Sequence, residues 1–154
     1  MNRVVILGRG GAGKSTLARQ IGQITQLPLI ELDKIFWKPG LVPTPPNEWI
    51  GVQQSLAAAD EWIMDGDLGP WDAPEVRLRR ADTVLFLDFS FLRCAWRAVW
   101  RSRERYDFWV WVLSYPYKRR PFLLEAITRC ASGADIRVFR GPADVGRFVE
   151  ALRS

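Results

Sequence analysis

Five short apolar segments alternate along the chain with longer stretches in which apolar residues recur every three or four positions. Short, almost continuously apolar segments are typical of buried strands in a parallel sheet, and the longer spacing is typical of helices. The predicted strands cover residues 3–7, 29–32, 62–64, 83–87 and 135–139. The predicted helices cover residues 14–26, 47–59, 91–104, 121–131 and 143–152. Repeated strand–helix alternation predicts a doubly wound α/β domain with parallel strands.

Two segments do not follow this alternation. Residues 38–46 read KPGLVPTPP, which contains too many prolines for a helix or a central strand, so we expect a loop or a mobile flap there. Residues 108–113 read FWVWVL, and the alternation of tryptophan with valine fits either a strand or a buried helix.

A glycine-rich loop directly follows the first predicted strand. Residues 8–16 read GRGGAGKST, which contains the complete phosphate-binding pattern GxxxxGK[ST]. Glycines let backbone N–H groups wrap around phosphates, the lysine reaches the β and γ phosphates, and the next helix directs its positive end at the anion. The alternative is a purely structural glycine turn. The residues predicted to bind ATP here are Gly8, Gly10, Gly11, Ala12, Gly13, Lys14, Ser15 and Thr16.

Three further predicted strands each end in an aspartate. These residues are Asp33, Asp65 and Asp88. Ligands of an open parallel sheet collect at the carboxyl ends of its strands, where these carboxylates are expected. We predict that Asp65, through water, and the hydroxyl of Ser15 hold Mg²⁺. Helix capping or turn formation is the alternative role for each aspartate.

Composition restricts the kinds of protein that this chain can be. Its 154 residues, 48% of them hydrophobic, suffice for one domain with a single core. No secretion signal is recognisable and the apolar segments are too short to span a bilayer, so we expect a soluble, cytoplasmic protein. The chain contains no histidine, which excludes Ser-His-Asp and Cys-His catalysis and His-built metal sites. Cys94 and Cys130 lack metal-ligand spacing, so core thiols are favoured.

Positive charge gathers in the second half of the chain. The net charge of +5, from 22 basic and 17 acidic residues, suits nucleotides, nucleic acid or acidic lipid as partners. Arginine recurs every four residues along the predicted helix 91–104 and just beyond it, and residues 118–120 form a second basic cluster. Such cations suit a phosphoryl group in transfer, whereas the alternative is a solvated helix face. The arginines of the first cluster are Arg93, Arg97, Arg101, Arg103 and Arg105.

Several sequence blocks together resemble the adenylate-kinase-like P-loop NTPases labelled DNA topology modulation proteins. The blocks are GRGGAGKSTLAR, LPLIELDKIFWKPG, EWIMDGD, RLRRADTVLFLD and the arginine-rich helix, and they cover nearly the whole chain. The resemblance implies a single three-layer domain like a nucleoside monophosphate kinase, with a five-stranded parallel sheet in the order 2-3-1-4-5. It also implies an acceptor-site insertion at about residues 34–60 and a small arginine-bearing lid at about residues 100–120, and it favours a helix at residues 108–113.

The resemblance gives roles to individual residues of the donor side. Gly8, Gly13, Lys14, Ser15 and Thr16 match the triphosphate and magnesium site. Arg97 and Arg101 match an RxxxR pair that begins the lid of adenylate kinases, and the loop that contains Arg140 matches the one that contacts adenine.

On the acceptor side, Asp33 is placed like an acceptor-binding aspartate of shikimate- and gluconate-type kinases, and Asp65 matches the start of the adenylate kinase acceptor motif. That motif continues as DGFPR, whereas residues 65–69 read DGDLG, so its phosphate-gripping arginine is missing. Arg77 and Lys38 are the predicted anion contacts in its place.

The sequence therefore predicts ATP- and Mg²⁺-dependent transfer of a phosphoryl group, by in-line displacement, to a nucleotide or another small-molecule acceptor. Lys14, Arg97 and Arg101 would neutralise the phosphates. Asp33 would orient the acceptor hydroxyl or accept its proton. One alternative is a nucleotide-binding regulatory protein with slow NTPase activity that acts on or near DNA, and another is a structural domain that does not bind ATP. We expect a monomer or weak dimer without a membrane partner, and nucleic acid is not the favoured partner.

Overall fold

The structure is a computed structural model that describes residues 1–90 and 119–154. Several sequence predictions lie outside the described residues: the helix at residues 91–104 with Arg97 and Arg101, the ambiguous segment 108–113, and nearly all of the lid. The described residues include the phosphate-binding loop and all three strand-end aspartates.

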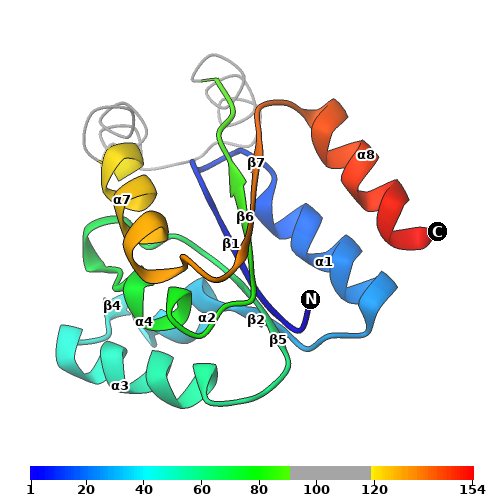
Figure 1. The fold of residues 1–154 in the computed structure, drawn as a ribbon. Helices are drawn as coiled ribbons and strands as arrows, with labels where there is room; N and C mark the ends of the chain where they lie inside the picture. The colour runs from blue at the N-terminus through cyan, green and yellow to red at the C-terminus, as the bar shows by residue number, and fades with distance from the viewer. Residues whose placement is uncertain (91–118) are drawn as a thin grey trace.

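Five parallel strands form the main sheet (Figure 1). They are β1 (Arg3–Gly8), β2 (Leu29–Glu31), β5 (Trp62–Asp65), β6 (Thr83–Leu87) and β7 (Asp135–Phe139). The order across the sheet is β2-β5-β1-β6-β7, and every neighbouring pair is parallel. Counted within this sheet, the order is second, third, first, fourth and fifth, which confirms the predicted topology.

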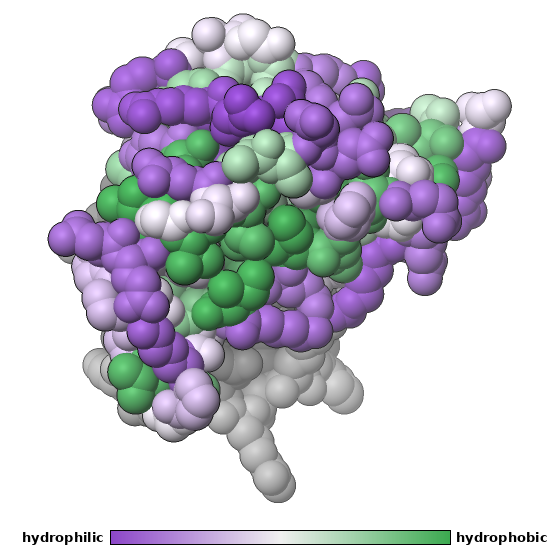
Figure 2. All heavy atoms as spheres, turned by 90° about the horizontal axis from the view of Figure 1, so that it is seen from below, coloured by the Kyte–Doolittle hydropathy of each residue, from purple (hydrophilic) through white to green (hydrophobic). Residues whose placement is uncertain are grey.

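Helices cover both faces of the sheet, giving three layers (Figure 1). Helices α1 (Lys14–Thr25) and α8 (Pro142–Arg153) lie on one face. Helices α3 (Pro46–Ala57), α4 (Pro74–Leu78) and α7 (Arg120–Cys130) lie on the other. Seen from below, at the end where the strands begin, apolar residues reach the surface among more numerous polar ones (Figure 2). None of the helices in the described parts of the chain is long and apolar enough to cross a membrane.

The segment that forms the central strand β1 is apolar throughout because it is buried on both faces of the sheet. Val5 and Leu7 pack into the cluster on the α3 side of the sheet, whereas Val4 and Ile6 pack into the cluster on the α1 side. All four side chains are fully buried, because successive residues of a strand point to opposite faces and both faces are covered. The strand therefore positions the phosphate-binding loop from the middle of the core.

The segment after β2 differs from the prediction. Strand β2 ends at Glu31, one residue earlier than predicted, and a short helix α2 (Leu32–Phe36) follows. Residues predicted to form a loop contain a small antiparallel hairpin of β3 (Trp37–Lys38) and β4 (Val42–Pro43). Thr44 holds this hairpin back against α2, because its N–H and its hydroxyl both donate to the carbonyl of Phe36. Proline is tolerated in such a two-residue edge strand.

Two further short elements were not predicted. A 3-10 turn η1 (Gly69–Trp71) follows β5, and α4 follows it directly. Each carries proline in its first turn, where the missing N–H has no helical partner to lose. These elements bring Asp72 and Arg77 against the loop that follows β5.

Candidate functional site

The site lies where the central strands end. In the parallel register, Asp65 of β5 stands beside Ile6 of β1 on one side and Glu31 of β2 on the other. The residues that directly follow these three strands therefore meet at one edge of the sheet, as expected for an open α/β domain. They are the phosphate-binding loop, the start of α2 and the loop that follows Asp65.

Three glycines of the phosphate-binding loop adopt a backbone conformation that other residues rarely adopt. Gly8, Gly11 and Gly13 have φ values of 145°, 79° and 95°. A Cβ at Gly8 would lie 2.6 Å from the carbonyl oxygen of Leu87, so no larger residue fits there. Gly10, the other glycine of the motif, does not have a positive φ.

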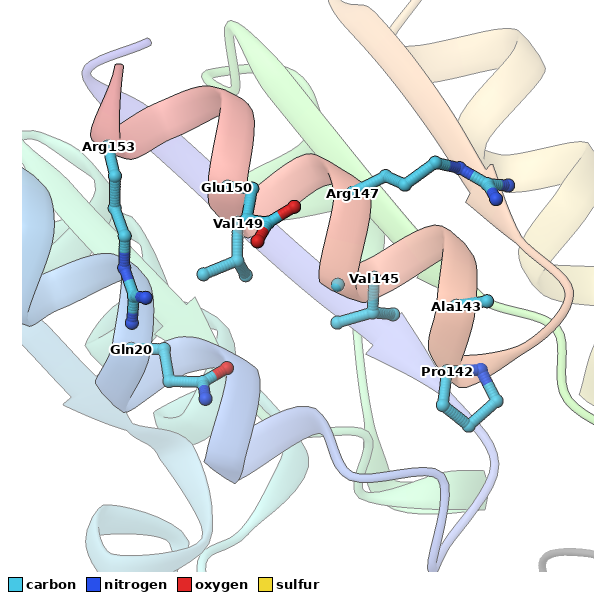
Figure 3. A pocket seen from close by; sticks show the side chains of 9 residues that line it. Gln20, Pro142, Ala143, Val145, Arg147, Val149, Glu150 and Arg153 are labelled. Atoms are coloured by element: carbon cyan, nitrogen blue, oxygen red, sulfur yellow. The ribbon is translucent and has the colours of Figure 1, made fainter.

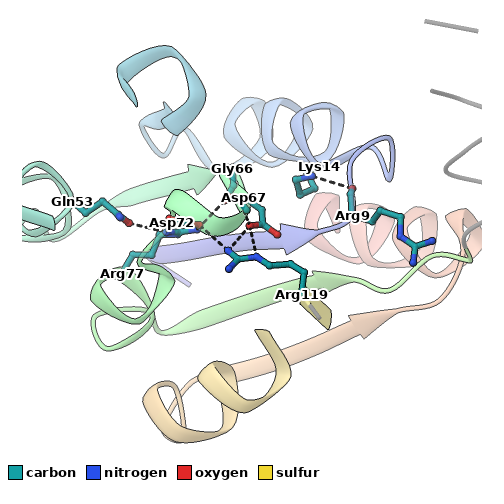
Figure 4. Close-up of polar contacts among 9 residues, drawn as sticks. Arg9, Lys14, Gln53, Gly66, Asp67, Asp72, Arg77 and Arg119 are labelled. Atoms are coloured by element: carbon teal, nitrogen blue, oxygen red, sulfur yellow. Dashed lines mark hydrogen bonds and ion pairs between the residues drawn. The ribbon is translucent and has the colours of Figure 1, made fainter. Parts of the chain in front are cut away.

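The lysine of this loop is folded over the loop backbone. The Nζ atom of Lys14 donates to the carbonyl of Arg9 at 3.1 Å, as Figure 4 shows. Lys14 begins α1, so its ammonium group and the positive end of the helix lie at the same place. Ser15 and Thr16 follow in the first turn. This arrangement presents one cation and a helix N-terminus to an anion, which suits the phosphates of a nucleotide.

Asp65 ends β5 with a buried carboxylate. The residue is 4% exposed, and its Oδ1 atom has no hydrogen-bond partner among the described residues. A buried carboxylate oxygen normally has a partner, so this atom suits a magnesium ion or the water that surrounds one. The chain turns away at Gly66, where φ is 145° and a Cβ would lie 3.0 Å from the Cβ of Leu32.

Asp33 lies in the first turn of α2, not at the end of a strand as predicted. The residue is exposed, yet the surrounding protein removes part of the hydration of its carboxylate, and this raises the pKa of Asp33 above its ordinary value. Lys14 lowers that pKa, whereas Asp65, Asp72 and Asp67 raise it further. A carboxylate with a raised pKa that still feels the charge of Lys14 is suited to accept a proton beside the phosphate-binding loop.

The structure corrects the prediction for Arg77. This residue was expected to contact an acceptor, but its side chain is fully buried and its amino groups are occupied. They donate to the two carboxylate oxygens of Asp72 at 2.9 and 2.7 Å, to Oε1 of Gln53 at 2.7 Å and to the carbonyl of Gly66 at 2.9 Å (Figure 4). Arg77 therefore supports the loop after β5 from below.

Arg119 extends this network to Asp67 (Figure 4). Its Nε donates to Oδ1 of Asp67 at 2.9 Å, and one amino group lies 3.4 Å from Oδ2 of Asp72. The N–H of Gly69 also donates to Oδ1 of Asp67. Two arginines and two aspartates thus fix the backbone that carries Asp65.

The sequence does not predict Arg119, Asp67 or Asp72 as part of the site. Arg119 was noted only as a member of a basic cluster, 52 residues away from Asp67 along the chain. The acidic composition of residues 65–72, which read DGDLGPWD, could have indicated this network. Aspartates that are buried require compensating cations.

The other predicted residues lie outside this cluster. Lys38 is exposed on the hairpin and forms an ion pair with Glu48 of α3 at 2.8 Å. Arg140 precedes α8, and its backbone N–H donates to Asp144 at 3.0 Å. Hydrogen bonds from Arg120 hold the carboxylate of Asp88 and lower its pKa.

A shallow groove of about 570 Å³ lies between α1 and α8 (Figure 3). Gln20 of α1 and Val145, Val149 and Arg153 of α8 line it. None of the predicted ATP, magnesium or acceptor residues lines this groove. The predicted phosphate- and magnesium-binding residues therefore lie at the strand ends and not in this groove.

No family model matches the chain, and no curated protein does. Solved structures of kinases do match it over nearly its whole length. A shikimate kinase from Acinetobacter baumannii in complex with shikimate has a TM-score of 0.69 at 15% identity, covering 99% of this chain and 90% of that chain. The fold is that of the P-loop kinases.

Two further kinases share this fold. A shikimate kinase from Bacteroides thetaiotaomicron has a TM-score of 0.63 at 18% identity, covering 99% of both chains. A gluconokinase from Sinorhizobium meliloti 1021 has a TM-score of 0.60 at 18% identity, covering 99% of this chain and 91% of that chain. At these identities the P-loop kinase similarity concerns the fold, and the resemblance to DNA topology modulation proteins stays a prediction.

Proposed function

We propose that the protein is an ATP-dependent kinase that phosphorylates a hydroxyl group of a small molecule. The proposal rests on one juxtaposition: α2, which carries Asp33, and the phosphate-binding loop, which carries Lys14, both begin at the same edge of the sheet, where β2 and β1 end on either side of β5. A proton acceptor beside a phosphate cradle is what transfer to a hydroxyl requires. The kinase fold supports the same function.

On the donor side, the loop amides and Lys14 bind the β and γ phosphates of ATP. For this, the ammonium group of Lys14 exchanges the carbonyl of Arg9 for phosphate oxygens. Ser15 and Asp65 are the residues that would hold Mg²⁺, which neutralises phosphate charge when it is bound. We assign Arg140 to the adenine side, and Arg97 and Arg101, outside the described residues, to the charge that develops in transfer.

On the acceptor side, Asp33 orients the hydroxyl and takes its proton. The hydroxyl oxygen forms a bond to the γ phosphorus, and the bond from that phosphorus to the bridging oxygen breaks, so ADP leaves with the bond electrons. Asp67, Arg119, Asp72 and Arg77 do not react. They hold the loop that places Asp65.

Asp33→Asn is expected to lower kcat about 10²- to 10⁴-fold, because the amide does not accept the hydroxyl proton. In the parent protein, kcat should fall as acidity protonates Asp33, at a pH above the ordinary aspartate range because the pKa of Asp33 is raised. The variant should lack this acidic limb. Steady-state rates across the acidic range test both statements, and Glu125→Gln, an exposed carboxylate change on α7, is the control.

Asp33→Asn is also expected to change the thermal stability of the protein. A folded protein that raises the pKa of Asp33 disfavours its charged form, so the carboxylate lowers the free energy of unfolding above that pKa. Asp33→Asn should therefore unfold at a higher temperature than the parent at neutral pH. A variant that is both inactive and less stable would point to a structural role instead.

Asp65→Asn is expected to raise the Mg²⁺ concentration needed for half-maximal activity by about tenfold. The neutral amide keeps the shape of the side chain but removes the charge that attracts the ion. Titration of activity with Mg²⁺ at saturating ATP measures this, with Asp135→Asn on the exposed β7 pair as control. An unchanged Mg²⁺ requirement would remove Asp65 from the metal site.

The regulatory alternative on DNA has less support from the described residues. Two members of the basic cluster at residues 118–120, Arg119 and Arg120, donate to Asp67 and Asp88. Guanidinium groups engaged in this way are less suited to contact a phosphate backbone. Slow acceptor-independent hydrolysis together with DNA binding that weakens steeply with salt would favour that alternative over a kinase.

A further inference from the structure

We propose, on the basis of the kinase function above, that the phosphoryl acceptor is an uncharged hydroxyl compound with an apolar ring face. Sugars and nucleosides share this chemistry. The proposal disfavours acceptors anchored through a carboxylate or a phosphate, and it rests on the paired charges and the aromatic side chains of the described segments that carry Asp33 and follow β5.

Both arginines at the loop after β5 are neutralised by carboxylates. Arg77 is fully buried with Asp72, and the side chain of Arg119, which is 11% exposed, lies on Asp67 and Asp72. An acidic acceptor would compete with these buried carboxylates for the guanidinium groups. A carboxylate displaced in this way would be buried without its partner, which is strongly unfavourable.

Both lysines of the segment between β2 and α3 are also paired. Lys34 forms an ion pair with Glu31, and Lys38 forms one with Glu48. These pairs are exposed and weak, so they do not block an anion by themselves. They do mean that the acceptor segment presents each of its lysines beside a carboxylate rather than as an isolated cation.

The charges that act on Asp33 come from Lys14 and from three carboxylates, Asp65, Asp67 and Asp72. Lys14 is committed to the phosphates of ATP in the proposed reaction. Arg119 and Arg77 pair with Asp67 and Asp72, so the like charge that an acceptor anion would meet is that of Asp33 itself, which disfavours its binding. An uncharged hydroxyl compound avoids this repulsion and can still donate its hydroxyl proton to Asp33.

The segments that carry these carboxylates also bring two tryptophans into contact. Trp71 of η1 directly precedes Asp72 and is 51% exposed, and its ring contacts that of Trp37 edge-on, with centroids 5.8 Å apart. Trp37 follows Asp33 by four residues and packs against Phe36. The neighbouring hairpin exposes Leu41 and Val42 as well. Tryptophan faces bind the apolar faces of nucleobases and other rings without requiring charge.

The test compares acceptors that differ only in charge. The pairs are adenosine with AMP, guanosine with GMP, and glucose with gluconate, and each compound is titrated by calorimetry into protein saturated with Mg²⁺ and a non-hydrolysable ATP analogue. Saturation keeps the nucleotides out of the donor site. We expect the neutral member of the bound pair to bind at least about tenfold more tightly. Which pair binds shows whether the acceptor is a nucleoside or a sugar.

Tighter binding of an anionic member overturns the inference, as does a protein that binds the ATP analogue but no neutral member. The kinase function is tested separately by whether binding of the analogue depends on Lys14 and whether ATP phosphorylates the bound acceptor. An acceptor that is phosphorylated but anionic would therefore refute the inference while leaving the kinase intact.

Trp71→Ala provides an independent check, because an exposed ring is removed. We expect affinity for the neutral acceptor to fall roughly tenfold, with affinity for the ATP analogue unchanged. Val138→Ala removes a similarly exposed apolar side chain from β7, at the opposite edge of the sheet, and should change neither. If Trp71→Ala binds the acceptor as tightly as the parent does, the aromatic side chains do not contact the acceptor and the inference is wrong.

Discussion

Lys14→Ala is expected to lower kcat/KM for the proposed phosphoryl transfer by about 10²- to 10³-fold and to weaken ATP binding. Lys14 is the cation at the N-terminus of α1 within the phosphate-binding loop, and its Nζ already contacts the loop backbone at Arg9. Removing it leaves the phosphate cradle without its central positive charge. Steady-state kinetics with ATP as the varied substrate, together with calorimetry, measure both effects.

Lys34→Ala is the matched control, because it removes a lysine whose side chain is exposed on α2 and paired with Glu31. Its kinetic constants for ATP should stay within about twofold of the parent, as expected for a weak surface ion pair. Equal ATP affinity in the parent and in Lys14→Ala would contradict a nucleotide-dependent function of any kind.

Arg77→Met is expected to lower the free energy of unfolding by about 3–5 kcal/mol. Burial alone would raise the pKa of Asp72, but the charge and hydrogen bonds of Arg77, together with Arg119 and a backbone hydrogen bond from Leu68, outweigh burial and lower it. Without Arg77, Asp72 remains buried with the longer contact to Arg119 and the backbone hydrogen bond from Leu68. The loss should be largest near neutral pH and smaller in acid, because protonation removes the uncompensated charge of Asp72. Denaturant unfolding at several pH values measures it.

The chain contains a matched exposed pair of the same residue types. Arg137→Met removes the partner of Asp135 on β7 and should cost about 0–1 kcal/mol. Replacing both buried partners, as Arg77→Met with Asp72→Leu, should recover much of the loss, because no buried charge is then left alone. A loss in Arg77→Met no larger than in Arg137→Met would show that the buried network does not stabilise the fold.

The elements that depend on neighbouring residues in the sequence could be predicted. Strand β1 and the phosphate-binding loop follow from a continuous apolar segment next to a glycine motif, and both are local. The strand order followed from the resemblance. The meeting of Asp65 with the phosphate-binding loop then follows from topology, since parallel strands end at the same edge of the sheet.

The features that the sequence did not reveal depend on tertiary partners. Arg77 is buried because Asp72 and Gln53 receive its donors, and nothing in the residues around position 77 indicates where those partners lie. Arg119 reaches Asp67 across 52 residues. Asp33 was predicted at the end of a strand but lies in the helix that follows it. The strand ends at Glu31 and the helix has only five residues, so a change in a few backbone angles separates the two structures.

Detection of the phosphorylated acceptor tests the central claim most directly. Protein, Mg²⁺ and ATP are incubated with each neutral hydroxyl compound, and ³¹P NMR follows the γ-phosphoryl group over time. The proposed function predicts a new phosphate ester that appears in equal amount to ADP, that depends on Lys14 and that is lost in Asp33→Asn. ADP that appears only with inorganic phosphate, with every acceptor, would contradict it.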